Sequence, residues 1–268
     1  MLLRPVITLT TDFGYADPFV GVMKGVMAGI CPEASVIDIT HGIRSHDIAG
    51  AAYALGTNYR YFPEGTVHVA VVDPGVGSDR RPILAVTDRY MFVGPDNGIF
   101  SLVYKQEKSS LRVFHITSDR YLLKKTSSTF QGRDLFAPVA AWLAKGEASE
   151  SFGAVISDYK VLDLPIVKNK CLSLTGEIIS IDKFGNCITN ISEADIYALT
   201  ENLNISSLKA AINGREIMFA DCYSSAENNG LHCLINSSDR LEIFVYMSSA
   251  ANEASISVGD ALELCLIQ

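Results

Sequence analysis

Short apolar runs rich in β-branched residues alternate with longer apolar segments through the first half of the chain. The short runs predict strands, and one of them is apolar almost throughout, as is typical of a strand covered on both faces. We expect strands at residues 5–12, 35–40 and 65–73, a hairpin at 82–88 and 90–94, and helices at 18–30, 46–62 and 133–146. This alternation predicts an α/β domain with a largely parallel sheet.

The pattern changes after about residue 160, where strand-like runs and turn residues replace the helical segments. Runs at 241–247 and 261–267 predict strands, and Gly185-Asn186 marks a turn between two others. We therefore expect a smaller β-rich domain in the second half. The predicted organisation is an N-terminal α/β domain at 1–162, a linker at 163–172 and a C-terminal β-rich domain at 173–268.

The composition is that of a compact globular protein, since 48% of the 268 residues are hydrophobic and 19% are charged. A net charge of −8 without clustered Lys or Arg argues against a nucleic-acid partner. Arg4 and Pro5 interrupt the apolar start, so we do not expect a signal peptide there. The apolar segment at 18–31 is too short for a membrane span and contains Lys24. We expect a cytoplasmic protein without a membrane partner.

Six cysteines are scattered along the chain without a C-x-x-C pair. This spacing favours reduced, mostly buried thiols over a metal or redox motif. The five histidines do not combine with other ligands at the spacing of a metal site. We therefore expect no bound metal.

Polar side chains follow each of the three strands predicted first. They are Asp12 after the first strand, His41, His46 and Asp47 after the second, and Asp73, Arg80 and Arg81 after the third. Ligands of open α/β sheets bind beyond the carboxyl ends of the strands, so this edge is the predicted site. Each residue alone also fits a turn or a helix cap, and the Asp-Pro-Gly at 73–75 is a strong turn signature. Asp96 precedes an Asn-Gly pair that a simple turn explains equally well.

In the second half, the stretch IDKFGNCITN holds Asp182, Phe184, Asn186 and Asn190 close together. A ring, amides and a carboxylate suit the binding of a heteroaromatic ligand. A hairpin turn at Gly185 explains part of the same pattern. The stretch is the candidate ligand-binding segment of the second domain.

Five sequence blocks occur in the order found in one known family: ITLTTDFGYADPFVGVMKGVM, VVDPGVGSDRRPI, VGPDNGIFS, TFQGRDLFAPVAA and SIDKFGNCITNI. From about residue 6 to the C-terminus the chain resembles the S-adenosyl-L-methionine (SAM) hydroxide adenosyltransferases, relatives of the SAM-dependent fluorinase and chlorinase enzymes. The resemblance implies an N-terminal α/β domain, a C-terminal β-barrel-like domain and a homotrimer. It places the ligand between the N-terminal domain of one subunit and the C-terminal domain of its neighbour.

The reaction implied by the resemblance uses no cofactor and has SAM as its small-molecule substrate. Water or hydroxide attacks C5′ and releases adenosine and L-methionine. Asp12, with Phe13 beside it, matches the carboxylate that holds the two ribose hydroxyls, a task that suits a bidentate acceptor. Asp182 matches the group that binds the methionine ammonium, and Phe184 and Asn186 fall at adenine-contacting positions.

The resemblance also implies a catalytic set near the reacting carbon, in which Asp73 and Arg80 match the family's Asp and Arg. The family usually reads TFHGRD, so Gln131 stands where a His is expected. A Gln amide can orient a water but cannot exchange protons near neutral pH. Ser237 fits a carboxylate- or base-contacting position, although the nearby YMSSAANEAS departs from the family's usual Gly-containing turn.

We therefore expect a SAM hydrolase in which Asp73 and Arg80 position water and Gln131 completes the network. One alternative is a protein that binds SAM or adenosine without turnover. Another is a SAM-dependent halogenase, a branch that also lacks the His. The carboxylate of Asp73 argues against that branch, because it would repel an incoming halide.

Overall fold

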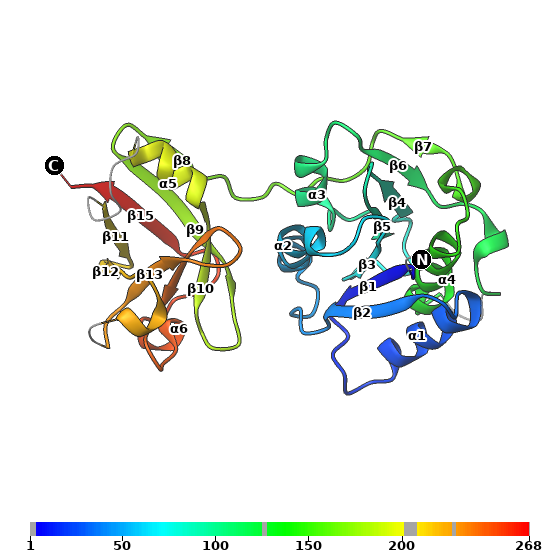
Figure 1. Cartoon of the computed structure of the whole chain (residues 1–268), viewed down its shortest axis with the longest axis horizontal. Coiled ribbons are helices and arrows are strands. Elements are labelled where there is room, and N and C mark those ends of the chain that lie inside the picture. The colour runs from blue at the N-terminus through cyan, green and yellow to red at the C-terminus, as the bar shows by residue number, and fades with distance from the viewer. Residues whose placement is uncertain (1–3, 125–127, 201–207, 227–228, 268) are drawn as a thin grey trace. The chain divides into compact units, whose positions relative to one another are not determined.

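The computed structural model describes residues 4–124, 128–200, 208–226 and 229–267. The chain forms two compact units, Met1–Asp163 and Leu164–Gln268, which are described separately (Figure 1). Strand β8 (Lys168–Lys170) lies inside the segment that we expected to be a linker.

The first unit is built on a seven-stranded sheet with the order β2-β1-β3-β5-β4-β6-β7. Four neighbouring strands run parallel: β2 (Ser35–Thr40), β1 (Val6–Thr11), β3 (Val67–Val71) and β5 (Met91–Pro95). An antiparallel edge is added by β4 (Pro82–Val86), β6 (Arg112–His115) and β7 (Val155–Ile156). The predicted α/β fold and the β4–β5 hairpin are confirmed.

Helices cover both faces of this sheet (Figure 1). On one face α1 (Phe19–Ile30) and α4 (Ala137–Ala144) bury apolar side chains against alternate residues of β1 and β3. On the other face α2 (Ile48–Asn58) and α3 (Ser101–Gln106) pack on β4 and β5. The sheet is thus buried on both sides, which explains its nearly continuous apolar strands.

Two predicted helices differ at their ends. The helix expected at 46–62 begins at Ile48, where the Asp47 side chain accepts the Gly50 N–H at 2.8 Å, and it continues past Asn58 as a 3₁₀ turn (Tyr59–Tyr61). The helix expected at 133–146 starts with a π-helical turn (Gly132–Phe136) and ends at Ala144. Short 3₁₀ turns also lie at Asp119–Tyr121 and Ser149–Phe152.

The second unit is a β-barrel. Seven strands pair in the order β10-β14-β13-β12-β11-β15-β9, and β9 pairs with β10 to close the ring. They are β9 (Ser173–Ile181), β10 (Cys187–Ser192), β11 (Leu208–Ile212), β12 (Arg215–Phe219), β13 (His232–Ile235), β14 (Arg240–Phe244) and β15 (Ala261–Leu266). Strand β8 extends the sheet beyond β9, and α5 (Glu193–Thr200), α6 (Ala250–Glu253) and a 3₁₀ turn (Tyr223–Ser225) connect strands. The predicted barrel-like fold is confirmed.

All six cysteines are free. Three are buried and three are exposed, so the expectation of mostly buried thiols is wrong for half of them: Cys31, Cys187 and Cys233 are buried, and Cys171, Cys222 and Cys265 are exposed. Within the described residues, no helix has both the length and the apolar character needed to cross a bilayer.

Candidate active site

A cavity of about 390 Å³ opens in the first unit beyond the carboxyl ends of β1, β2 and β3. Its lining comes from the loops that follow these strands and from the segment before α4: Asp12, Phe13, Asp17, Phe19, Ser45, His46, Val71, Asp73, Val76, Thr129, Phe130, Gln131 and Gly132. Because β1, β2 and β3 are parallel neighbours, residues distant in sequence meet at this edge. The structure thus brings Asp12, Phe13, Asp73 and Gln131 together.

Asp73, Arg80 and Gln131 form one hydrogen-bonded network. The Nε of Arg80 lies 2.9 Å from each carboxylate oxygen of Asp73, and its Nη2 donates to Asp73 and to the amide oxygen of Gln131. Both charged side chains are 5% exposed, and the guanidinium lies 5.3 Å above the Phe136 ring. Charge-assisted bonds in a buried setting fix geometry well, so the Asp73 carboxylate is held rigidly.

The π-helical turn determines where Gln131 lies. The Ala137 N–H bonds to the Gly132 carbonyl, five residues back, which widens the first turn of the helix. A side chain at Gly132 would approach Met23 Sδ and the Phe130 ring to 3.1 Å. The wide turn therefore packs closely on α1 while Gln131 reaches the guanidinium of Arg80.

Asp12 is held by the loop after β2. The backbone N–H of His46 donates to Asp12 Oδ2 at 2.9 Å, and His46 has a left-handed backbone with φ +69°. The Gly14 N–H donates to the His41 carbonyl at 2.8 Å. These bonds tie the β1 loop to the β2 loop and fix the direction of the Asp12 carboxylate.

His41 is buried and does not line the cavity. Its Nδ1 lies 2.7 Å from Thr11 Oγ1, and its Nε2 lies 3.1 Å from Asp38 Oδ1. Although burial opposes the shift, hydrogen bonds from Lys24, His41 and Tyr15 lower the pKa of Asp38. His41 therefore supports the loop that carries His46.

The cavity wall combines aromatic rings with carboxylates. Phe13, Phe19 and Phe130 contact one another edge to face or tilted, with centroids 5.1 to 6.2 Å apart. The described lining includes three carboxylates, from Asp12, Asp17 and Asp73, and no Lys or Arg. Such a wall favours a cationic ligand with an apolar body.

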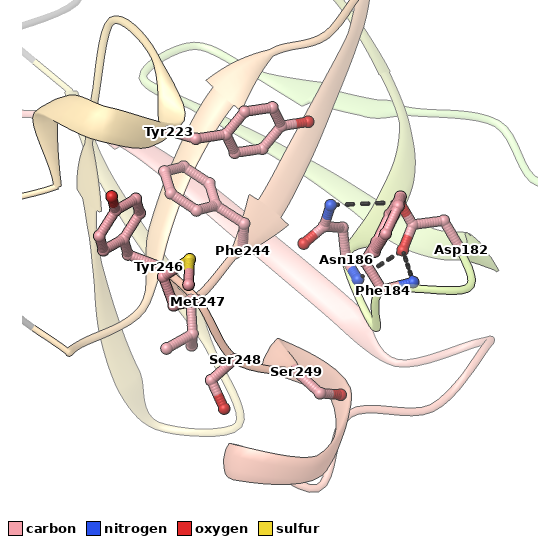
Figure 2. Close-up of a pocket in the computed structure, with 10 residues that line it drawn as sticks. Asp182, Phe184, Asn186, Tyr223, Phe244, Tyr246, Met247, Ser248 and Ser249 are labelled. Atoms are coloured by element: carbon pink, nitrogen blue, oxygen red, sulfur yellow. Dashed lines mark hydrogen bonds between the residues drawn. The ribbon is translucent and has the colours of Figure 1, made fainter.

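A second cavity, of about 620 Å³, lies in the barrel unit between the β9–β10 turn and the end of β14 (Figure 2). Asp182, Phe184 and Asn186 line it on the turn side. Asp182 Oδ1 accepts the N–H groups of Phe184 and Asn186 at 2.8 and 2.9 Å, and Oδ2 accepts the Asn186 side chain at 3.1 Å. The Asp182 carboxylate thus organises the turn as well as facing the cavity.

Gly185 makes this turn possible. Its φ is +85°, and a Cβ at this position would lie 2.0 Å from Ser249 Oγ. The Ala251 N–H also bonds to the Gly185 carbonyl at 3.0 Å. The turn therefore packs directly against the segment that enters α6, which forms the floor of the cavity in Figure 2.

The opposite wall was not predicted from the sequence. Tyr223, Phe244, Tyr246 and Met247 line it, and Met247 is 90% exposed with φ +56°. Tyr223 donates to the buried Glu242 at 2.6 Å, and burial together with this bond raises the pKa of Tyr223. The one signal in the sequence was the departure of YMSSAANEAS from the Gly-containing turn that the resemblance implies, and it concerns Tyr246 and Met247 only.

Two candidates from the sequence lie elsewhere. Ser237 lies in the turn between β13 and β14 and does not line the described part of the barrel cavity. Asn190 is buried, with its side chain bonded to the Glu177 N–H and the Pro165 carbonyl. Asn190 therefore has a structural role.

Arg81 and Asp96 also support the fold. Arg81 pairs with the buried Asp96 at 2.7 Å and with Asp158 at 2.8 Å, which fastens the segment after β7 to the sheet. Across the described ranges, no group of three or more His, Cys, Asp or Glu side chains is arranged to hold a metal ion.

Comparisons with known proteins agree with this architecture. Profiles of the SAM hydroxide adenosyltransferase N-terminal and C-terminal domains match residues 7–153 and 176–263. An (R)-S-adenosyl-L-methionine hydrolase of Methanocaldococcus jannaschii is 37% identical, with 97% of this chain and 95% of that protein covered. One from Thermus thermophilus is 34% identical, covering 98% and 100%.

A more distant relative and a solved structure are also similar to most of this chain. A fluorinase of Nocardia brasiliensis is 28% identical over 73% of this chain and 74% of its own. The crystal structure of an uncharacterized conserved protein from Thermotoga maritima has a TM-score of 0.89 at 33% identity, covering 97% of this chain and 99% of that one. The resemblance inferred from the sequence is confirmed, and the chain belongs to the SAM hydroxide adenosyltransferase family.

Proposed function

We propose that this protein hydrolyses SAM to adenosine and L-methionine by attack of water at C5′. The observation that carries the proposal is the Asp73–Arg80–Gln131 network at the edge of a cavity that also holds Asp12. The relatives named (R)-S-adenosyl-L-methionine hydrolase support the substrate and the reaction.

The charge of the cavity suits this substrate. SAM is a sulfonium, and its positive charge disappears as the C5′–S bond breaks and a neutral thioether leaves. The carboxylates of Asp12, Asp17 and Asp73 favour binding of the cation, and the phenylalanine rings exclude water from its apolar parts. Leaving-group protonation is unnecessary, so the protein's task is to position the water.

In the proposed mechanism Asp73 and Gln131 orient the attacking water. Arg80 fixes both residues, and holding the reactants in line is worth roughly 7 to 11 kcal/mol in favourable cases. Asp12, with Phe13 beside it, holds the ribose hydroxyls. Asp182 binds the ammonium of the methionine part, and Phe184 and Asn186 contact the adenine.

Incubation of the purified protein with SAM and chromatography of the products tests the proposal. We expect adenosine and methionine in equal amounts. Tight binding with full recovery of SAM would instead establish a binding protein, and a chloride-dependent 5′-chloro product would establish a halogenase. The acidic lining argues against the halogenase, because carboxylates repel a halide.

We also propose a homotrimer whose sites combine the N-terminal unit of one subunit with the C-terminal unit of another. Mixing Asp12→Ala with Asp182→Ala subunits tests this assembly. Refolded mixtures, assayed at SAM concentrations well below the KM of either variant, should regain part of the activity that each variant has lost, because some sites then have both native halves. A monomer by light scattering, or mixtures as inactive as the parents, would exclude it.

A further inference from the structure

His46 brings an imidazole to the cavity that holds Asp73 and Gln131. The remaining titratable side chains of the described lining are those of Asp12, Asp17 and Asp73. Hydrolysis releases a proton from the attacking water, and a positioned acceptor accelerates such a step by about 10²- to 10⁴-fold. One of these four side chains is therefore placed to accept it.

The side-chain oxygens of Gln131 and Asp73 already accept hydrogen bonds from Arg80. The amide oxygen of Gln131 accepts from Arg80, so its NH₂ group faces away as a donor. A neutral imidazole at this position would present the same pattern, one accepting nitrogen toward Arg80 and one N–H. Gln131 thus preserves the orienting function of a His and lacks only proton exchange. Both oxygens of Asp73 accept from Arg80, so this carboxylate is already engaged in holding the guanidinium.

The backbone of His46 is fixed by hydrogen bonds at the wall of the cavity. Its N–H bonds to Asp12 at 2.9 Å, and its carbonyl accepts the Ile48 N–H at 3.0 Å. The left-handed conformation of a non-glycine residue is strained, and such strain concentrates at functional sites. His46 therefore lies beside the proposed ribose ligand Asp12 and lines the same cavity as Asp73.

We infer that His46 is the catalytic base of this protein, an inference that rests on the proposed hydrolysis. The water oxygen forms its bond to C5′ while the C5′–S bond breaks, and sulfur keeps the electron pair as the neutral thioether of methionine. The proton passes from the water oxygen to a neutral imidazole nitrogen of His46. The imidazolium then releases this proton to solvent.

The charged groups around His46 are mostly carboxylates. Charged groups near it in space or sequence are Asp12, Asp17 and Asp73 of the lining, Arg80 behind Asp73, and Arg44 and Asp47 in its own loop. His41, the other histidine of this loop, is buried against Thr11 and Asp38 and supports the loop instead.

His46→Asn is the decisive variant. Asn tolerates the left-handed backbone and keeps the N–H for Asp12, but it does not titrate. We expect kcat to fall about 100-fold or more, KM to stay within about threefold, and the acid limb of the pH–rate profile to disappear. Added imidazole should restore part of the turnover of His46→Gly, which adopts this conformation freely. His115→Asn on β6, outside the cavity lining, is the matched control and should behave as wild type.

Retention of wild-type kcat and pH profile by His46→Asn overturns the assignment. If Asp17→Asn then loses the acid limb, that carboxylate accepts the proton. Thermal melting of each variant shows whether lost activity comes from unfolding or from removal of the proton acceptor. His46→Gly replaces His46→Asn if the latter does not fold. An inactive wild-type protein overturns the proposed function and this assignment together, whereas an active His46→Asn overturns only the assignment.

Discussion

Arg80→Met tests whether the buried pair with Asp73 holds the site together. Methionine fills most of the space of the Arg stem and can still pack on the Phe136 ring, so the main loss is the charge. The Asp73 carboxylate, 5% exposed, then loses all the bonds it accepts from the guanidinium. The amide oxygen of Gln131 loses its donor as well.

Removal of one partner from a buried ion pair costs about 3–5 kcal/mol, because the other charge is left uncompensated. A domain of this size loses about 2–4 °C in Tm per kcal/mol, so we expect the transition of the first unit to fall by roughly 10 °C. Asp73→Leu/Arg80→Met removes both charges. It should therefore be more stable than Arg80→Met by at least about 2 kcal/mol.

Calorimetry at neutral pH measures these differences. Arg112→Met is the control, because Arg112 pairs with Glu150 on the surface, where both side chains are more than half exposed. Its effect should stay within about 1 kcal/mol. An Arg80→Met protein that melts within about 2 °C of wild type would falsify the argument. A double variant no more stable than Arg80→Met would also contradict it, since the cost would then come from packing.

Three further predictions concern single side chains. Asp12→Ala should raise KM for SAM by about tenfold or more and change kcat less, in steady-state assays of adenosine formation. Gln131→His should leave kcat within about threefold, whereas Gln131→Leu, which removes the acceptor for Arg80, should lower it at least about tenfold. Burial lowers the pKa of His68 to about 3, while the unfolded chain binds this proton near pH 6.5, so acid favours unfolding between these values. Urea titrations at pH 7 and pH 5 measure this effect. Between these two pH values, the free energy of unfolding should fall by about 2 kcal/mol less in His68→Phe than in wild type.

The periodicity of the sequence predicted the elements that depend on local pattern and burial. Strands β1, β2 and β3 and helix α1 lie close to the predicted ranges, because buried parallel strands and amphipathic helices have distinct spacings. The end of α2 could not be predicted in this way. Tyr59 enters a 3₁₀ turn that buries its ring and brings its hydroxyl 2.5 Å from Glu107, a contact between residues distant in sequence.

The candidate site was also predicted only in part, where it depends on local sequence pattern. The gathering of Asp12 and Asp73 at one sheet edge followed from parallel neighbouring strands, which the sequence could indicate. The bond between Arg80 and Gln131 joins residues 51 positions apart and depends on a π-helical turn that no periodicity signals. The aromatic wall of the barrel cavity comes from Tyr223 and from the end of β14, which no single motif contains.

The presence of Gln at position 131 is related to the presence of His46 in the loop after β2. An orienting group beside Asp73 must accept from Arg80, and an amide and a neutral imidazole do so with the same hydrogen-bond polarity. A His at 131 could accept a proton only by giving up its bond to Arg80, whereas His46 has its backbone, and not its ring, bonded to Asp12. Because one residue orients the water and another accepts its proton, Gln131 can replace a His without disabling the site. On this reasoning His46, and not Gln131, determines the pH dependence of the proposed reaction.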